Sequence, residues 1–109
     1  MNGSKRICLQ AVTRAERHLM VEAVSAAIGS SGGWVLDFNL FSNIAISIAF
    51  EIPAGQWDCL VERFAKLDWR LDQPPAGLDD RHGDLSVSLH LTFIHNEGDL
   101  RRPIPSIPG

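Results

Sequence analysis

Period-two alternation of large apolar side chains runs through the middle of the chain and constrains the fold more than any other feature. Apart from Ser42, every even position from Leu36 to Ile52 holds Leu, Ile or Phe, and the odd positions are mostly small or polar. Such alternation predicts two half-buried strands, 34–40 and 44–52, with their large side chains on one face. Pairing Leu40 with Ile44 across a three-residue connection would keep both stripes on that face.

The stretch before this hairpin predicts a strand and a helix. Apolar residues alternate in residues 5–13, which indicates the strand. Thr13 followed by Glu16 fits a capping box, in which Thr13 would be the N-cap of a helix. Apolar residues then recur at three- and four-residue spacing as far as Ile28, and Gly29 would end the helix in a left-handed conformation.

The stretch after the hairpin predicts a second helix and at least one more strand. Pro53 is suited to open the helix, because the first turn needs no N–H donor there. Apolar residues at helical spacing then mark its buried stripe: Trp57, Leu60, Val61, Phe64 and Leu67. Alternation returns twice, briefly in 67–72 and clearly in 85–95, and the sequence leaves open which of these segments is the fourth strand.

The order strand–helix–strand–strand–helix–strand is typical of the ferredoxin-like split βαβ arrangement (βαββαβ). We therefore predict an α+β domain with a four-stranded antiparallel sheet and two helices on one face of it. A chain of 109 residues is the size of one domain, which we place at 1–96. Residues 97–109 are rich in proline and are predicted to be a disordered tail.

Composition excludes several classes of partner. The formal net charge is −3, which disfavours a nucleic-acid or anionic-membrane partner. The open face of the predicted sheet would hold Ala45, Ser47, Ala49 and Cys8 on its central strands, where an RNA-binding sheet needs stacking aromatic residues. The apolar run 19–28 is too short to cross a membrane. The cytoplasm is therefore the expected location.

The sequence lacks the residue patterns of catalytic and metal sites. It has no G-x-S-x-G, H-E-x-x-H or P-loop motif, and no histidine adjoins Cys59 to activate it as a nucleophile. The two cysteines do not form C-x-x-C, and no two of the four histidines have helical i, i+4 spacing. We expect no catalytic residue, no metal and no cofactor, and two reduced, partly buried thiols.

The turn between the first strand and the first helix is the best candidate for a ligand site. The N-terminus of a helix offers unpaired N–H groups and a positive dipole end, which favour a carboxylate or phosphate. The predicted ligand-binding residues are Thr13, Arg14, Arg17 and His18, and the ligand would be an amino acid or a small anion. The alternative is that the arginines only solvate an exposed first turn.

Three segments of the chain, within residues 5–72, resemble the ACT domain family. They are VTRAERHL at 12–19, SGGWV at 31–35 and AFEIP at 49–53. They are similar to the turn before the first helix, the glycine-containing entry to the second strand and the acidic end of the third strand in that family. The resemblance implies a non-catalytic regulatory domain that pairs as a homodimer and binds an amino acid between paired domains.

Two other kinds of function stay open at this point. The first is a small ferredoxin-like enzyme, similar to the acylphosphatases or the dimeric monooxygenases, and Arg14 and Asn39 are the possible counterparts of the arginine and asparagine of an acylphosphatase. The second is a domain that only binds another protein, through the open face of the sheet or through the tail 97–109.

Overall fold

The structure is a computed structural model that describes residues 6–42, 44–75, 78 and 83–94. Its elements, in chain order, are β1 (Ile7–Thr13), α1 (Arg17–Ser30), β2 (Trp34–Ser42), β3 (Ala45–Pro53), a 3-10 turn (Ala54–Gln56), α2 (Trp57–Ala65), β4 (Arg70–Leu71) and β5 (Asp84–Phe93). The tail 97–109 and Asn43 of the hairpin connection lie outside the described residues.

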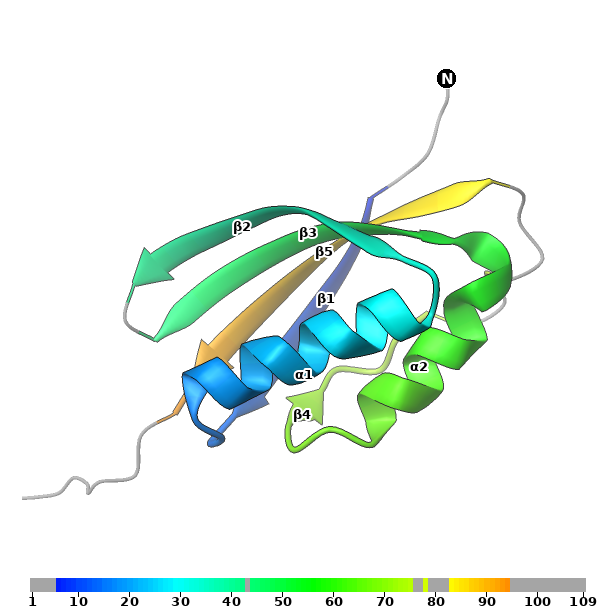
Figure 1. Ribbon diagram of the computed structural model, residues 1–109. Helices are drawn as coiled ribbons and strands as arrows, with labels where there is room; N and C mark the ends of the chain where they lie inside the picture. Colours follow the sequence, from blue (N-terminus) through cyan, green and yellow to red (C-terminus); the bar gives the residue numbers. More distant parts are fainter. Residues whose placement is uncertain (1–5, 43, 76–77, 79–82, 95–109) are drawn as a thin grey trace, which may run out of the picture.

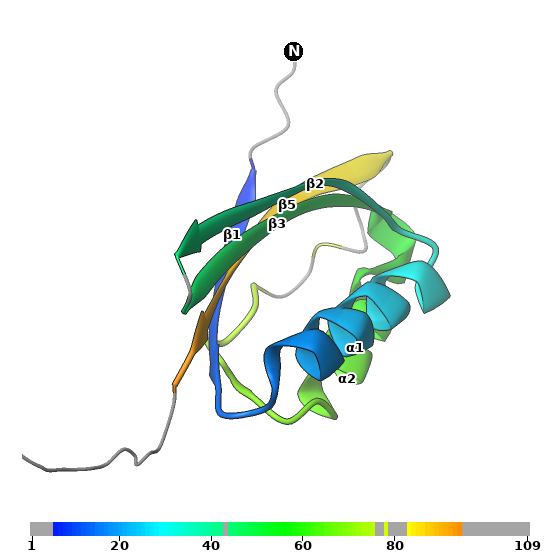
Figure 2. The same cartoon turned by 60° about the vertical axis from the view of Figure 1, so that its left-hand side comes forward.

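The strands form one mixed sheet in the order β2-β3-β5-β1-β4, and both helices cover the same face of it (Figures 1 and 2). β5 runs antiparallel to β3 and parallel to β1. The α+β class and the two helices are confirmed. The prediction of a four-stranded antiparallel sheet is wrong, because both of the segments that competed for the place of the fourth strand are strands.

The central position of β5 follows from its side chains. Its helix-facing residues are all buried: Leu85, Val87, Leu89, Leu91 and Phe93. A strand with five large apolar side chains on one face gains most where neighbours lie on both sides, because each Å² of apolar surface removed from water contributes about 25 cal/mol. β4 has only two residues, pairs with Ala11 and Val12 of β1, and lies at the edge.

In the hairpin of β2 and β3, even-numbered residues of one strand pair with even-numbered residues of the other at Phe38 and Leu40, as predicted, but the register differs. Leu40 pairs with Ile46, and the predicted pairing with Ile44 is wrong. The pairing shifts at Leu36 and at Phe41, which are extra residues that bulge from β2. The second bulge absorbs one residue near the turn, so the strands pair further along. Between the two bulges Phe38 and Leu40 still share a face with Ile48 and Ile46, whereas before Leu36 the faces are exchanged and Val35 pairs with Phe50.

Both ends of α1 differ from the prediction. Glu16 is the N-cap, and its carboxylate accepts the N–H groups of His18 (2.9 Å) and Leu19 (3.2 Å), so the helix begins at Arg17. A carboxylate placed there offsets the positive end of the helix dipole. The capping role predicted for Thr13 is wrong.

The C-terminal stop of α1 lies three residues later than predicted. Gly29 is still helical, and Gly32 has the positive φ of 82° that a left-handed residue needs. Gly33 then donates its N–H to the carbonyl of Ile28 at 2.9 Å, which satisfies one of the last helical acceptors. Pro53, predicted to open the second helix, is instead the last residue of β3, and α2 begins only after the 3-10 turn.

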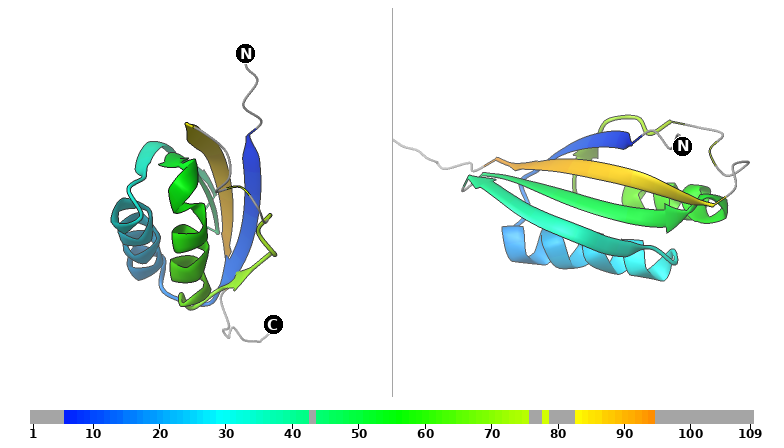
Figure 3. Two further views of the ribbon diagram at one scale, coloured as in Figure 1. Left: turned by 90° about the vertical axis from the view of Figure 1, so that its right-hand side faces the viewer. Right: turned by 90° about the horizontal axis from the view of Figure 1, so that it is seen from above.

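The core lies between the sheet and the two helices (Figure 3). α2 contributes Trp57, Leu60 and Phe64, each fully buried, and α1 contributes Met20, Val24, Ala27 and Ile28. The indole N–H of Trp57 donates to the carbonyl of Pro75 at 2.9 Å, which ties the connection between β4 and β5 to α2. Among the described residues, no helix is long and apolar enough to cross a membrane.

Candidate interaction site

β2 is an apolar strand whose side chains are exposed on both faces. All nine of its residues are exposed, and large apolar side chains among them keep about half of their surface in water: Trp34, Val35, Leu36, Phe38, Leu40 and Phe41. By contrast, Ile46 and Ile48, their neighbours on β3, are 1% and 0% exposed. The helices therefore cover the even-numbered stripe on β3 but leave it open on β2.

β2 is also the end of the sheet in the part of the chain that the structure describes, so no strand pairs with its outer edge. Proteins commonly protect such an edge with Lys or Pro, and β2 contains neither. Its single charged residue is Asp37. Exposed apolar strands of this kind are typical of surfaces that bind another polypeptide.

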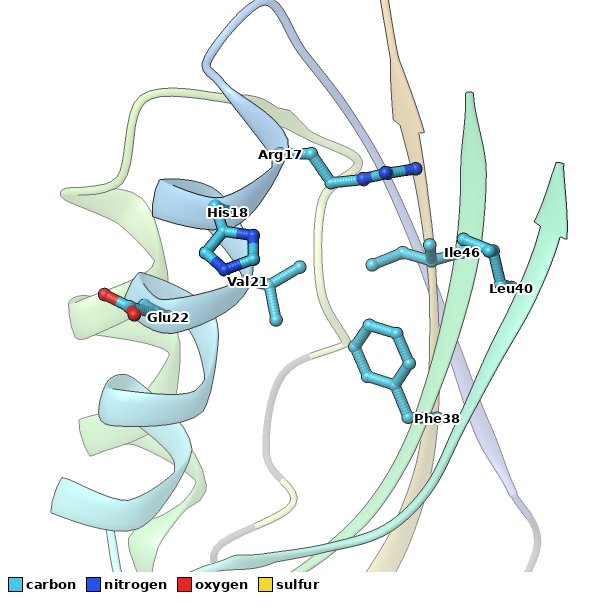
Figure 4. Close-up of a pocket in the computed structure, with 7 residues that line it drawn as sticks. All are labelled: Arg17, His18, Val21, Glu22, Phe38, Leu40 and Ile46. Atoms are coloured by element: carbon cyan, nitrogen blue, oxygen red, sulfur yellow. The ribbon is translucent and has the colours of Figure 1, made fainter. Parts of the chain in front are cut away.

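A groove of about 310 Å³ lies between α1 and β2 (Figure 4). Its floor and outer wall are the apolar side chains of Phe38, Leu40 and Ile46, and Val21 faces them from the helix. The polar lining residues come from α1: Arg17, His18 and Glu22. In Figure 4 the guanidinium of Arg17 reaches from the helix toward the strands, above the apolar side chains. The groove thus joins an apolar wall to charged groups on one side.

The structure brings together two of the four predicted ligand-binding residues. Arg17 and His18 both line the groove, whereas Thr13 and Arg14 do not. Thr13 is only 2% exposed; its hydroxyl donates to the carbonyl of Asp68 at 2.6 Å and accepts the N–H of Ala15 at 3.0 Å. Thr13 therefore fixes the end of β1 to the segment after α2.

The N-terminus of α1 is already occupied by a carboxylate of the chain itself. The pKa of Glu16 is lowered chiefly by the hydrogen bond that its carboxylate accepts from the N–H of His18, with a smaller contribution from Leu19. Glu16 is thus ionised where an external anion would bind, and it already accepts N–H groups that such a ligand would need. Arg17 and His18 instead line the groove.

The backbone and side chains at the middle of β2 form a small polar network. The N–H of Phe38 donates to the carboxylate of Asp37 at 2.8 Å, and the amide of Asn39 donates to the other oxygen of that carboxylate at 3.2 Å. A side-chain acceptor at a strand N–H is what an edge residue uses when no strand lies beside it. The network is confined to residues 37–39.

The face of the sheet away from the helices has the small and polar residues that the alternation predicts. Asn39, Ser47, His90 and Gln10 form one row across four strands. The ring of Phe41 stacks on that of His90, with 6.4 Å between their centroids. Phe41 of the edge strand thus reaches across β3 to the central strand β5 on the open face.

The described residues hold no cluster of three or more His, Cys, Asp or Glu side chains that could bind a metal. Arg14 and Asn39, the pair considered for an acylphosphatase-like site, do not meet. Asn39 is level with Gln10 of β1, about 14 Å away across three strand spacings, and Arg14 lies four residues further along the chain. The insertion of β5 widens this separation by one strand.

The two cysteines are unpaired and lie in different surroundings. Cys8 is exposed on β1, and Cys59 is partly buried on α2. The hydrogen bond from Arg63 lowers the pKa of the Cys59 thiol, and a second from the hydroxyl of Ser31, 3.9 Å away, adds to this effect. The partial burial expected of both thiols is therefore confirmed for Cys59 and wrong for Cys8.

Sequence reasoning missed the apolar part of the groove: Val21, Phe38, Leu40 and Ile46. Alternation predicted Phe38, Leu40 and Ile46 as ordinary core residues, and only the last of them is buried. A local signal was present in the absence of Lys, Arg and Pro from 34–42. Comparison of the chain with protein-family models, with curated proteins and with solved structures finds no match.

Proposed function

We propose that this chain is a non-catalytic, ACT-like regulatory or interaction domain that works by binding an extended polypeptide strand along β2. The observation that supports the proposal is the exposure of a nine-residue apolar strand at the end of the sheet. A strand added there would pair with the outer backbone groups of β2, and its side chains would cover Phe38 and Leu40, which line the groove.

The role of β2 is tested with a matched pair of leucines. Leu40 on β2 and Leu19 on α1 are 60% and 65% exposed, and Leu19 is not among the residues that line the groove. The probe is a blocked synthetic peptide with the sequence of residues 34–42, extended by lysines for solubility, and its binding is followed by amide chemical shifts. We expect the shifts at β2 and at the groove-facing side of α1.

Leu40→Glu should weaken binding of the peptide at least tenfold, because it buries a carboxylate in an apolar contact. Leu19→Glu should leave the affinity within about twofold, since it changes the same residue type at similar exposure outside the contact. Shifts centred on β1 or β4, or equal effects of both variants, would contradict the assignment of β2.

A second candidate function is binding of an amino acid or small anion in the groove, and it is favoured by the presence of Arg17 and His18 beside an apolar wall. The test is a thermal-shift panel of amino acids and small carboxylates. A ligand of the folded chain raises the midpoint by mass action. Arg17→Gln should abolish that rise, whereas Arg14→Gln should preserve it, because Arg14 does not line the groove. If only Arg14→Gln abolished the ligand-induced rise of the midpoint, the binding site would be the turn before α1 and not the groove.

A further inference from the structure

We infer that the strand that binds β2 is the β2 strand of a second copy of this chain, antiparallel to it and related by a two-fold axis at Phe38. This inference rests on the proposed function and names its partner. The observations that carry it are the spacing of charged, polar and apolar residues along β2 and the hydrogen bonds at residues 37–39.

Symmetry restricts how two copies of β2 can pair. Residues directly opposite each other in an antiparallel pair lie on the same face, so the axis must pass through a residue, not between two. An axis at Asp37 would oppose two carboxylates, which is unfavourable. An axis at Asn39 would place Asp37 opposite Phe41, a polar group against an apolar one. An axis at Phe38 has neither fault.

With the axis at Phe38, like chemistry meets like. Phe38 lies beside its own copy, at the centre of the regular part of the edge. Asp37 lies opposite Asn39 on both sides of the axis, so each carboxylate faces an amide that can donate to it. The charged residue of the strand thus gains a polar partner twice, and the larger apolar side chains cover one another.

The hydrogen bonds at the edge fit the same arrangement. In the single chain the carboxylate of Asp37 accepts the N–H of Phe38 and the amide of Asn39. In the pair, the N–H of Phe38 would donate to the carbonyl of the Phe38 copy, and the carboxylate would accept from the Asn39 copy in exchange. No donor or acceptor at the centre of the contact is left without a partner.

The geometry favours a closed pair over a filament. The opposite edge of the sheet is β4, whose two residues are too few to extend the pairing. The bulges at Leu36 and Phe41 also confine the regular edge of β2 to residues 37–40. The groove lining supplies further apolar surface.

The test changes the charge of residue 39 and measures the dissociation constant of the pair by sedimentation over a wide range of concentrations. Asn39→Asp opposes two pairs of carboxylates and should raise the dissociation constant about three- to tenfold at low salt. Asn39→Lys creates two Asp–Lys pairs and should lower it by a similar factor, with the gain lost at about 0.5 M salt. Adding Asp37→Lys to Asn39→Asp should restore association, because the opposite charges meet again.

Gln10→Lys is the matched control, since Gln10 is exposed on the same face and in the same row, three strands away from the edge. It should leave the dissociation constant unchanged. A dimer that is weakened by Asn39→Lys, or indifferent to both charges, would overturn the axis at Phe38. A wild-type chain that stays monomeric at high concentration while the β2 peptide still binds would overturn the second copy as partner and leave the proposed function standing. A chain that neither dimerises nor binds the β2 peptide would overturn both the second copy as partner and the proposed function.

Discussion

Replacing Phe64 with alanine is expected to lower the free energy of unfolding by about 3–5 kcal/mol, because it removes a large core side chain and leaves a cavity. Phe64 is fully buried on α2. Its ring lies edge-on to the rings of Phe50 and Trp69, with 6.3 Å and 5.1 Å between the ring centroids. It therefore joins the sheet, the helix and the segment after the helix. Urea unfolding followed by fluorescence measures the change.

The matched control for this prediction is Phe38→Ala. Phe38 is 45% exposed on β2, so the same truncation should cost the single chain much less, about 1 kcal/mol. The experiment is made at a concentration where the chain is monomeric, so that any pairing through β2 does not contribute. A loss below about 1 kcal/mol for Phe64→Ala would show that α2 does not pack as described.

Replacing Gly33 with alanine is expected to lower the free energy of unfolding by about 1–3 kcal/mol, because the new methyl group would meet fixed backbone. A Cβ at Gly33 would lie 2.6 Å from the carbonyl oxygen of Glu51 and 3.0 Å from Cγ2 of Ile28. Gly33 is where the chain leaves α1 and passes close to β3. Relief would require a shift of β3 away from the helix end.

Gly29→Ala is the control, and we expect it to change the free energy of unfolding in the opposite direction. A Cβ at Gly29 meets nothing within 4 Å, and the residue is helical, so alanine should raise the free energy of unfolding by about 0.5 kcal/mol. Urea unfolding of both variants under one set of conditions makes the comparison. Equal and small effects at the two positions would contradict the close approach of Gly33 to Glu51.

The sequence was most informative where a pattern is local. The alternation in 44–52 and in 85–93 predicts strands, and the structure confirms both strands: Ile48 and Leu89 are fully buried, and His90 is exposed, although Ile44 is half exposed and Ser47 is buried. The helical spacing around Phe64 predicts α2 in the same way. These features follow from the two-residue period of a strand and the 3.6-residue period of a helix, which neighbours in the chain already define.

Capping was harder to predict than periodicity because several residues compete for one role. The sequence predicted Thr13 as the cap and Glu16 as its partner, but Glu16 is the N-cap and the hydroxyl of Thr13 donates to the carbonyl of Asp68. That contact joins residues 55 positions apart in the chain. Gly29 and Gly32 likewise both fit a helix stop, and the close passage of the chain at Gly33 favours the later one.

Of the residues that line the groove, only Arg17 and His18 are among the predicted ligand-binding residues, and Glu22 is not. Arg17 and His18 were identified from their charge and position, which are local properties. Phe38 and Leu40 were assigned to the core, because a single sequence shows that a side chain is apolar but not whether a helix reaches far enough to cover it. In the structure α1 contacts α2 and β2, but it leaves the side chains of Phe38 and Leu40 about half exposed.

By itself the sequence determined that the chain forms two amphipathic helices and several strands with one apolar face. Only the tertiary structure decided that β5 enters the middle of the sheet, parallel to β1, and that β2 is left at the edge with its apolar side chains exposed. Strand order depends on which apolar surfaces gain most from burial on both sides, and that comparison involves the whole chain at once.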